Sequence, residues 1–297
     1  MTSKTKAHIA LLSTNIFFAM NFTAVKSLLN DGLVKPFGLN LIRVGFSMIL
    51  LWILFLFKPV KSVIYKKDIG RFVLCALTGI AVNQLFFIQG LSFTSSIHAS
   101  LLLLTTPILI TIIAAWFLKE RLNRNKIIGL TLGITGAVIL VSQKGSTVEG
   151  ENILLGDILI ILNAISYTIY FILVKPLMAK YDPVVVIRMV FTIGFFMILP
   201  FGWNDFIEVP WQQYNTGDYL LLILIVFFGT FLAYLLNLYG IKTLGASMAG
   251  TYIYSQPVFA AIIAIIFLGE TLSWYKILSA ALIFGGVYLT NKASRND

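Results

Sequence analysis

The feature that most constrains the fold of this chain is a series of ten long apolar runs separated by short polar stretches. Each run has close to the ~20 residues that an α-helix needs to cross a bilayer core of about 30 Å. The runs cover residues 8–29, 37–57, 70–91, 95–118, 126–142, 153–174, 184–202, 218–240, 246–268 and 274–290. The alternation typical of barrel strands is absent, and backbone polar groups in lipid must be satisfied within their own segment. The sequence therefore predicts an all-α integral membrane protein with ten transmembrane helices.

The composition agrees with a membrane location. Of the 297 residues, 59% are hydrophobic and 11% are charged, whereas a soluble domain has roughly 45–50% apolar and about 25% charged residues. The net charge of +10 is spread over short loops and forms no single patch, so we expect no nucleic-acid partner. The single cysteine, Cys75, lies inside an apolar run and cannot form an intramolecular disulfide.

The Lys and Arg residues predict the orientation in the membrane. If the N-terminus is cytoplasmic, the inner loops receive most of these cations, and the outer loops receive only Lys35, Lys144 and Lys276. Short cytoplasmic loops carry an excess of Lys and Arg. We therefore expect a multi-pass protein of the cell inner (cytoplasmic) membrane, with both termini cytoplasmic and the lipid bilayer as its surroundings.

Two stretches of the chain repeat one pattern. The string TTPILITIIAAWFLKERL (residues 105–122) parallels SQPVFAAIIAIIFLGETL (residues 255–272), so Pro107 matches Pro257 and Glu120 matches Glu270 at an offset of 150 positions. Other pairs at this offset are Gly79 and Gly229, Gly90 and Gly240, Ala99 and Ala249, Lys126 and Lys276, and Gly136 and Gly286. A constant offset indicates an internal duplication. We predict a first repeat over residues 1–142, an outer linker over residues 143–152 and a second repeat over residues 153–297.

Each predicted repeat holds five spans, which is an odd number. The second copy must then enter the membrane from the opposite side, so the two repeats are expected to be inverted. Inverted repeats are common in secondary transporters, which bind substrate near the midplane between the halves. One half can then adopt the conformation of the other, which exchanges an inward-open shape for an outward-open one.

Several strings resemble a known family. They are NFTAVK at residues 21–26, Arg43 at the start of the second span, and the endings P…FLKERL…K…G and P…FLGETL…K…GG of the two halves. Together they resemble EamA-type transporters of the drug/metabolite transporter superfamily. The resemblance implies a ten-helix, inverted-repeat carrier of small metabolites, many members being exporters of amino acids or their derivatives. It does not fix the substrate.

Polar and aromatic residues within the spans predict a substrate pocket. Intramembrane polar groups are costly and mark functional sites, and here they gather on the first, third, fourth, sixth, eighth and ninth spans. The predicted substrate-binding residues are Asn15, Phe18, Asn21, Asn83, Phe87, Asn163, Tyr167, Tyr170, Tyr234, Asn237, Tyr252, Ser255 and Gln256, to which Thr105 and Thr106 add hydroxyls. The alternative is that these groups only link helices by hydrogen bonds.

Two prolines and two charge groups predict moving parts. Pro107 and Pro257 occupy equivalent positions and are predicted hinges, because proline frees a helix carbonyl; the alternative is a passive kink. Inversion predicts gate clusters of Glu270 with Lys26 or Arg43 at the outer surface, and of Glu120 with Lys175 or Arg188 at the inner surface. The alternative is that these charges only anchor helix ends, where ion pairs contribute about 0–1 kcal/mol.

The remaining signals are less specific. His98 lies within a span. One interpretation is that it binds substrate or a proton, and the alternative is that it only packs against its neighbours. No Asp or Glu stands near the centre of a span, so no carboxylate proton relay is predicted. Gly129, Gly133, Gly136, Gly285 and Gly286 suit close helix packing, within a monomer or at a homodimer face.

The sequence offers no motif of an enzyme. It contains no Walker A loop, no HExxH string and no metal-spaced cluster of Cys and His, so no catalytic residue, metal or cofactor is expected. The function predicted from the residues and the resemblance is secondary transport of a small-molecule substrate, in the export direction. The alternative is a passive channel or facilitator, or a membrane interaction protein without active transport.

Overall fold

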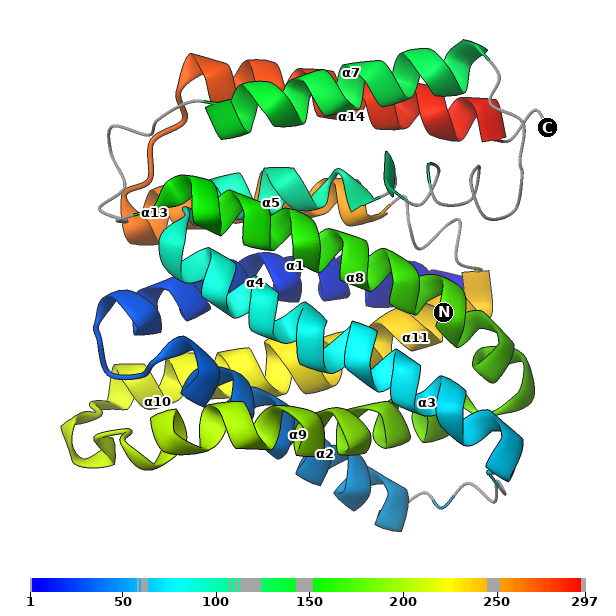
Figure 1. Ribbon diagram of the computed structural model, residues 1–297, viewed down its shortest axis with the longest axis vertical. Helices are drawn as coiled ribbons and strands as arrows, with labels where there is room; N and C mark the ends of the chain where they lie inside the picture. The colour runs from blue at the N-terminus through cyan, green and yellow to red at the C-terminus, as the bar shows by residue number, and fades with distance from the viewer. Residues whose placement is uncertain are drawn as a thin grey trace.

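A computed structural model describes residues 2–57, 59, 64–106, 108–109, 112, 124–142, 152–244 and 252–294. Every regular element in these ranges is a helix. The helices run roughly side by side in stacked layers, and the start of α1 and the end of α14 lie at the same end of the bundle (Figure 1).

The first half of the chain begins with two long helices, α1 (Ser3–Asn30) and α2 (Pro36–Phe57). A continuous helical stretch follows, made of η1 (Lys66–Asp68), α3 (Ile69–Ala76), the π-helical η2 (Leu77–Ala81) and α4 (Val82–Phe93). The half ends with α5 (Ser96–Leu103) and α7 (Arg124–Ser142).

The second half has a similar order of elements. It begins with α8 (Ile153–Lys180) and α9 (Pro183–Ile207), followed by η3 (Trp211–Gln213). A second continuous stretch contains α10 (Thr216–Ile223), the π-helical η4 (Leu224–Leu232) and α11 (Ala233–Leu244). The last elements are η5 (Ile253–Ser255), α13 (Gln256–Leu268) and α14 (Trp274–Ser294).

Six helical stretches are long and apolar enough to cross a membrane: Ser3–Asn30, Pro36–Phe57, Lys66–Phe93, Ile153–Lys180, Pro183–Ile207 and Thr216–Leu244. Shorter apolar helices cover Ile127–Leu140, Gln256–Leu268 and Trp274–Leu289. These helices fall on nine of the runs that the sequence predicts, and they confirm a multi-pass membrane protein. The count of ten spans stays a prediction.

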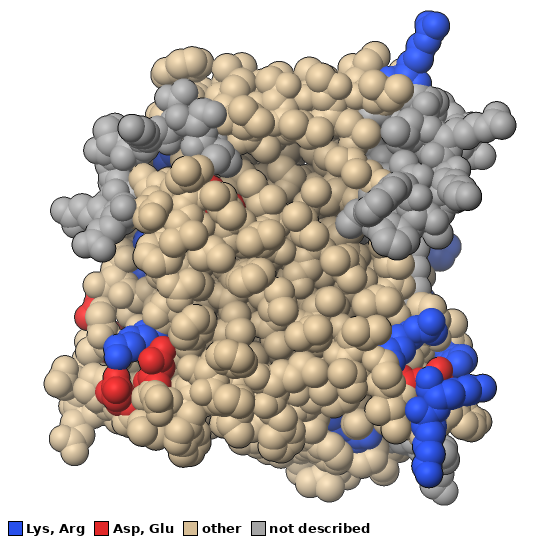
Figure 2. Space-filling model, viewed as in Figure 1, with Lys and Arg blue, Asp and Glu red and all other residues tan. Residues whose placement is uncertain are grey.

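The surface matches this assignment. Figure 2 shows charged side chains gathered at two opposite edges of the visible face and a broad uncharged band between them. Large apolar side chains within the helices, such as Phe196, Phe228 and Ile266, are exposed. An exposed apolar band of this kind is stable against lipid and would be unstable in water.

The halves are interleaved. Helix α1 of the first half packs against η4, α11 and α13 of the second, and α8 of the second half packs against α3, η2, α4 and α5 of the first. Two further pairs cross between the halves, α2 with α9 and α7 with α14. The α7–α14 pair forms the top layer of Figure 1.

Small residues allow the α7–α14 pair to approach closely. A Cβ atom added to Gly286 would lie 2.5 Å from the carbonyl oxygen of Gly129, and one added to Gly136 would lie 2.8 Å from the Ile283 side chain. Such spacing permits backbone-to-backbone contact between membrane helices.

Candidate functional site

A cavity of about 140 Å³ lies between the two halves. A single water needs only about 10–15 Å³ on this measure, so the cavity has room for several waters or a small organic molecule. Its lining comes from both halves and consists of Thr14, Asn15, Phe18, Asn21, Phe22, Arg43, Asn83, Gln84, Phe87, Leu103, Thr106, Asn163, Tyr167, Tyr234, Asn237, Ile253 and Gln256.

Most of the predicted substrate-binding residues line this cavity; the exceptions are Tyr170, Tyr252 and Ser255. The ring of Tyr170 packs against Gly79, where an added Cβ would lie 2.5 Å from it. The hydroxyl of Tyr252 is 2.8 Å from Nδ1 of His8, and the Ser255 hydroxyl donates to the Tyr252 carbonyl. Whether the lining residues bind substrate stays a prediction.

Two asparagines join the halves at the cavity wall. Nδ2 of Asn83 on α4 donates to the carbonyl of Asn163 on α8 over 3.2 Å, and Nδ2 of Asn163 donates to the carbonyl of Asn83 over 2.7 Å. A second contact between halves runs from Nε2 of Gln84 to the hydroxyl of Tyr234, over 2.8 Å. The two bonds between Asn83 and Asn163 fix the relative position of α4 and α8.

The amides of α1 are only partly satisfied. Nδ2 of Asn15 donates to the carbonyl of Leu11 over 2.8 Å. The Oδ1 atoms of Asn15 and Asn21 are buried and accept no hydrogen bond within the described part of the chain. A buried acceptor without a donor carries a free-energy cost. The Oδ1 atom of Asn21 faces Gly229 of η4, where an added Cβ would lie 2.6 Å from it, so this oxygen is packed between helices.

Aromatic rings form the apolar part of the lining. Phe18 meets Tyr234 edge to face with ring centroids 5.9 Å apart, and Phe22 meets Phe87 in the same way at 5.2 Å. Edge-to-face pairs of this kind are a favoured aromatic geometry. The rings give the cavity a rigid apolar surface beside its amides.

Arg43 differs from its expected position. We expected it near the outer surface, pairing with Glu270; instead it lines the cavity, and only 2% of its surface is exposed. Its Nε donates to the Thr230 hydroxyl over 3.2 Å, and its Cζ lies 5.8 Å from the centroid of the Phe87 ring. The position of Arg in sequence could not reveal this, because the long side chain carries the charge well away from its backbone.

The residues that sequence reasoning did not assign to the cavity are Thr14, Phe22, Arg43, Gln84, Leu103 and Ile253. Gln84 follows Asn83 directly and offered the same signal, a polar side chain inside an apolar run. Phe22, Leu103 and Ile253 offered none, because apolar side chains in a span do not differ from those facing lipid.

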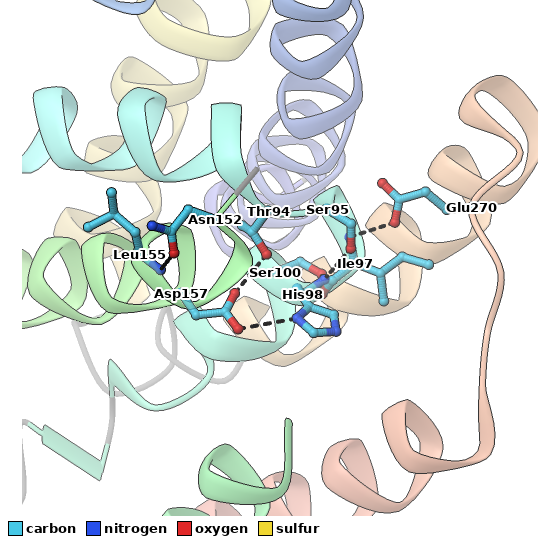
Figure 3. Close-up of polar contacts among 9 residues, drawn as sticks. All are labelled: Thr94, Ser95, Ile97, His98, Ser100, Asn152, Leu155, Asp157 and Glu270. Atoms are coloured by element: carbon cyan, nitrogen blue, oxygen red, sulfur yellow. Dashed lines mark hydrogen bonds and ion pairs between the residues drawn. The ribbon is translucent and has the colours of Figure 1, made fainter. Parts of the chain in front are cut away.

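Glu270 lies at the N-terminal end of α5 and forms no ion pair with the residues that the structure describes. Its Oε1 accepts from the backbone N–H of Ser96 over 2.8 Å. Its Oε2 accepts from that of Ile97 over 3.1 Å (Figure 3). A carboxylate at this position satisfies free N–H groups and interacts favourably with the helix dipole. Lys26 donates to the carbonyls of Leu91 and Ser92, so the expected contact of Glu270 with Lys26 is replaced by backbone contacts.

His98 has an acidic neighbour that the sequence did not predict. Oδ1 of Asp157 accepts from the Thr94 hydroxyl over 2.7 Å, and its Oδ2 lies 3.4 Å from Nδ1 of His98 (Figure 3). The Asp157 side chain is fully buried, and it comes from the second half whereas Thr94 and His98 come from the first. The sequence gives no sign of this partner, because Asp157 stands near the start of its span, where a carboxylate is usually hydrated.

The other end of the bundle also holds contacts between the halves. Asp68 accepts from Nζ of Lys180 over 3.0 Å and from the Tyr181 hydroxyl over 2.7 Å. Burial and the hydrogen bond to Asp68 raise the pKa of Tyr181, so its hydroxyl stays a donor at neutral pH.

Of the predicted inner gate cluster, only Arg188 can be described with its contacts. Arg188 lies over the rings of Phe55 and Trp52, with Cζ 3.6 Å and 4.5 Å from their centroids. Glu120 and the side chain of Lys175 lie outside the described residues, so their predicted contacts remain predictions.

Of the two predicted hinge prolines, the structure describes Pro257. Pro257 occupies the first turn of α13, directly after the 3-10 turn η5, and not the middle of a helix. Proline is well tolerated there, because its missing N–H would have no partner in the helix. Pro107 lies outside the described residues, and hinge motion at either proline stays a prediction.

A second hollow, of about 310 Å³, is larger but chemically plain. Its lining is Thr105, Ile108, Leu109, Ile112, Ile134, Ala137, Val138 and Ile161. With Thr105 as the single polar side chain in this lining, it cannot orient a polar metabolite. We therefore take the smaller, mixed cavity as the candidate site. Within the described ranges, no group of three or more His, Cys, Asp or Glu residues could hold a metal ion.

Comparison with known proteins relates the whole chain to transporters. The EamA-like transporter family matches residues 5–142 and again residues 154–292. An uncharacterized transporter of Archaeoglobus fulgidus is 25% identical over 296 residues, which is 98% of each chain. The uncharacterized transporter YetK of Bacillus subtilis is 24% identical over 245 residues, covering 82% of this chain and 74% of its own. A solved crystal structure with 16% identity and a TM-score of 0.62 covers 96% of this chain and 98% of its own, which shows a shared fold.

Proposed function

Because the chain belongs to the EamA-like transporter family, we propose that it is a secondary transporter that exports a small metabolite, such as an amino acid or a derivative, by alternating access. The observation that carries the proposal is the cavity between the halves. Both halves contribute amides and aromatic rings to its lining, and the first half contributes Arg43. Small-molecule sites combine apolar walls with a few placed polar groups in this way.

The proposed mechanism uses two inverted repeats, the first over residues 1–142 and the second over residues 153–297. The two matches to one family, residues 5–142 and 154–292, support this division. The contacts support the inversion: α1 meets η4, α11 and α13, whereas α8 meets the corresponding η2, α4 and α5. Equivalent contacts in both directions are what a two-fold axis between the halves requires.

Closing and opening the cavity requires contacts that form and break at each end. At one end, Glu270 of the second half holds the start of α5, and Asp157 holds Thr94. At the other end, Asp68 of the first half holds Lys180 and Tyr181. We propose that these contacts close the two ends in turn.

The alternative is a passive channel, or a membrane protein without transport activity. A solute flowing through a channel follows its own gradient, whereas a carrier couples the movement of one solute molecule to the return of another. Counterflow therefore separates the two. An intramembrane enzyme is not favoured, since the family is one of transporters.

The test begins with the purified full-length protein in detergent. Amino acids and their derivatives are screened for a rise in Tm, and each compound that binds is then loaded unlabelled into proteoliposomes. We expect labelled compound added outside to accumulate transiently above equilibrium and to saturate with concentration. Non-saturable equilibration, or no movement beyond that of protein-free liposomes, would contradict a carrier.

A further inference from the structure

A buried histidine and a buried carboxylate meet between the halves, at the end of the bundle where Glu270 binds the start of α5. Nδ1 of His98 on α5 lies 3.4 Å from Oδ2 of Asp157 on α8 (Figure 3). The two side chains are 4% and 0% exposed. Neither of them lines the cavity of the candidate site, so contact with a transported molecule in that cavity does not explain the pair.

The backbone brings the pair together at a close contact between the two halves. A Cβ added to Gly156 of α8 would lie 2.9 Å from the carbonyl oxygen of Gly90 and 2.9 Å from the backbone nitrogen of Thr94. Asp157 follows Gly156 directly, and its Oδ1 accepts from the Thr94 hydroxyl over 2.7 Å. The carboxylate is thus removed from water, which is costly unless a positive charge or enough hydrogen bonds compensate.

The lysines at this end are occupied by another carboxylate. Besides the pair itself, the titratable or charged groups that the structure describes at this contact are Lys26 of α1, Tyr275 and Lys276 of α14, and Glu270 after α13. Both lysines interact electrostatically with Glu270. The Tyr275 ring lies edge to face with the His98 ring, with centroids 6.3 Å apart. Of the described residues, only His98 lies within ion-pair distance of Asp157.

The other elements packed against α5 add no charge here. Helices α4 and α13 contain no Asp, Glu, Lys, Arg or His. The remaining charged residues of α1, α8 and α14 stand at the far ends of these helices. Helix α7 packs against α14 with Gly129 beside Gly286, so the Arg and Lys in its first turn lie beside the end of α14, far from Tyr275. The charge opposite Asp157 therefore depends on the imidazole.

We propose that His98 and Asp157 form a proton-binding site that closes this end of the bundle, which the cation bias of the loops places outside. A proton added to the imidazole makes both ring nitrogens donors and turns the contact into an ion pair between the halves. Without that proton, the closed contact holds a buried carboxylate that faces no cation. Proton uptake therefore favours closure, and by linkage the closed form binds the proton more tightly than the open form.

The proposal rests on the alternating closure proposed above and adds a ligand, the proton, at one of the two ends. The other end has a different chemistry, because Asp68 is paired there with Lys180. Histidine is the side chain that ordinarily changes charge between about pH 5 and 8, and lysine is not. The second histidine of the chain, His8, contacts the neutral hydroxyl of Tyr252 and forms no ion pair with a described residue.

The test measures how pH changes access to the cavity from outside in intact cells, and it needs no substrate. The probe is Leu103→Cys in a Cys75→Ala background, labelled with an impermeant maleimide at pH 6 and at pH 8, within the range where histidine titrates. Thiolate is the reactive form of cysteine, so labelling itself rises with pH. Each rate is therefore divided by the rate of the exposed Gln212→Cys at the same pH.

We expect the normalised rate to be about fivefold or more lower at pH 6 than at pH 8, as is typical of coupling between two equilibria. His98→Gln keeps a donor but binds no proton, so its rate should be alike at both pH values. Asp157→Asn should abolish or reverse the dependence, because protonated His98 would then lack an anion. His8→Gln is the matched control and should keep the full dependence.

A normalised rate that does not change with pH would overturn the proposal. A dependence that survives either His98→Gln or Asp157→Asn, or that is lost equally in His8→Gln, would overturn it too. If His98→Gln does not remain monodisperse on purification, Asp157→Asn decides. Counterflow keeps the two proposals apart: pH-dependent labelling without counterflow of any compound contradicts transport only, and counterflow with pH-independent labelling contradicts the proton site only.

Discussion

The lining of the cavity contains two kinds of amide. Asn83 and Asn163 each donate one hydrogen bond to the backbone carbonyl of the other across the halves. Asn237 and Gln256 also line the cavity, and neither side chain has a hydrogen bond to another described residue. Residues of the first kind join α4 to α8, whereas the second kind make no such contact, and their whole amide is available to a ligand.

This distinction gives a prediction at the scale of the residue. Asn237→Ala and Gln256→Ala should each weaken binding of the transported compound by roughly threefold to tenfold, since one lost hydrogen bond costs about 0.5–1.5 kcal/mol. The measurement is the concentration of half-maximal counterflow. Tyr170→Phe removes a hydroxyl outside the cavity and should change nothing. Unaltered counterflow at subsaturating concentrations in both alanine variants would remove these residues from the site.

The candidate site could be predicted from the sequence where polarity alone was informative. Asn15, Asn83 and Gln256 stand out because an amide inside an apolar run is costly. The cavity position of Arg43 and the partner of His98 could not be predicted. Both depend on which residue of the other half lies opposite, and a pattern within one segment does not contain that information.

At the scale of the element, the α7–α14 pair depends on glycine at one face only. A Cβ added to Gly286 would lie 2.5 Å from the carbonyl oxygen of Gly129 and 2.6 Å from the backbone nitrogen of Gly133. A Cβ added to the adjacent Gly285 would have no atom within 4 Å. The two neighbouring glycines therefore form a matched pair, one facing the partner helix and one facing away.

We expect Gly286→Ala to lower the Tm of the purified protein, because overpacking a close contact typically costs about 1–3 kcal/mol. Gly285→Ala should leave the Tm unchanged or raise it slightly, since alanine is the better helix former by up to about 1 kcal/mol. Thermal unfolding in detergent measures both variants. Equal Tm values would show that the helices separate enough to accept the methyl group and that close packing is not required.

Glu270 gives a second prediction for an element, the start of α5. Glu270→Gln removes the negative charge that two backbone N–H groups and the helix dipole stabilise. A shift of about 1 kcal/mol toward opening at this end would raise the open population about fivefold. The probe is Leu103→Cys at the cavity, in a Cys75→Ala background, labelled with an impermeant maleimide from outside. The labelling rate should rise several-fold.

The control is Glu208→Gln, which removes a carboxylate that lies 2.6 Å from Lys35 in an exposed pair. The Glu208 contact raises the pKa of Lys35, but exposed pairs contribute little to conformational equilibria. Labelling at position 103 should therefore be unchanged by this variant. An equal rise in both variants would mean that any loss of outer negative charge is enough, and that Glu270 has no specific part in closure.

At the scale of the whole molecule, apolar run length predicted most of the helices, because the bilayer thickness sets their length regardless of tertiary detail. The π-helical turns η2 and η4 within the stretches at residues 66–93 and 216–244 were not predicted. A π turn changes the hydrogen-bond register by one residue, and this change leaves no trace in the hydropathy of the sequence. Such turns are frequent at functional sites, and here Thr230 of η4 holds Arg43.

Orientation is the last prediction, and the inverted repeat depends on it. Gln212 of η3 and Lys66 of η1 are both exposed. The connection from α9 to α10, which contains η3, and the start of α3, which follows η1, lie at opposite ends of the bundle (Figure 1). The cation bias of the loops puts Lys66 inside and Gln212 outside. In a Cys75→Ala background, Gln212→Cys should react with impermeant maleimide in intact cells, and Lys66→Cys should react only after the membrane is opened. Reaction of both in intact cells, or the reverse order, would place the cations outside and would remove the basis for assigning Glu270 and Asp157 to the outer closure.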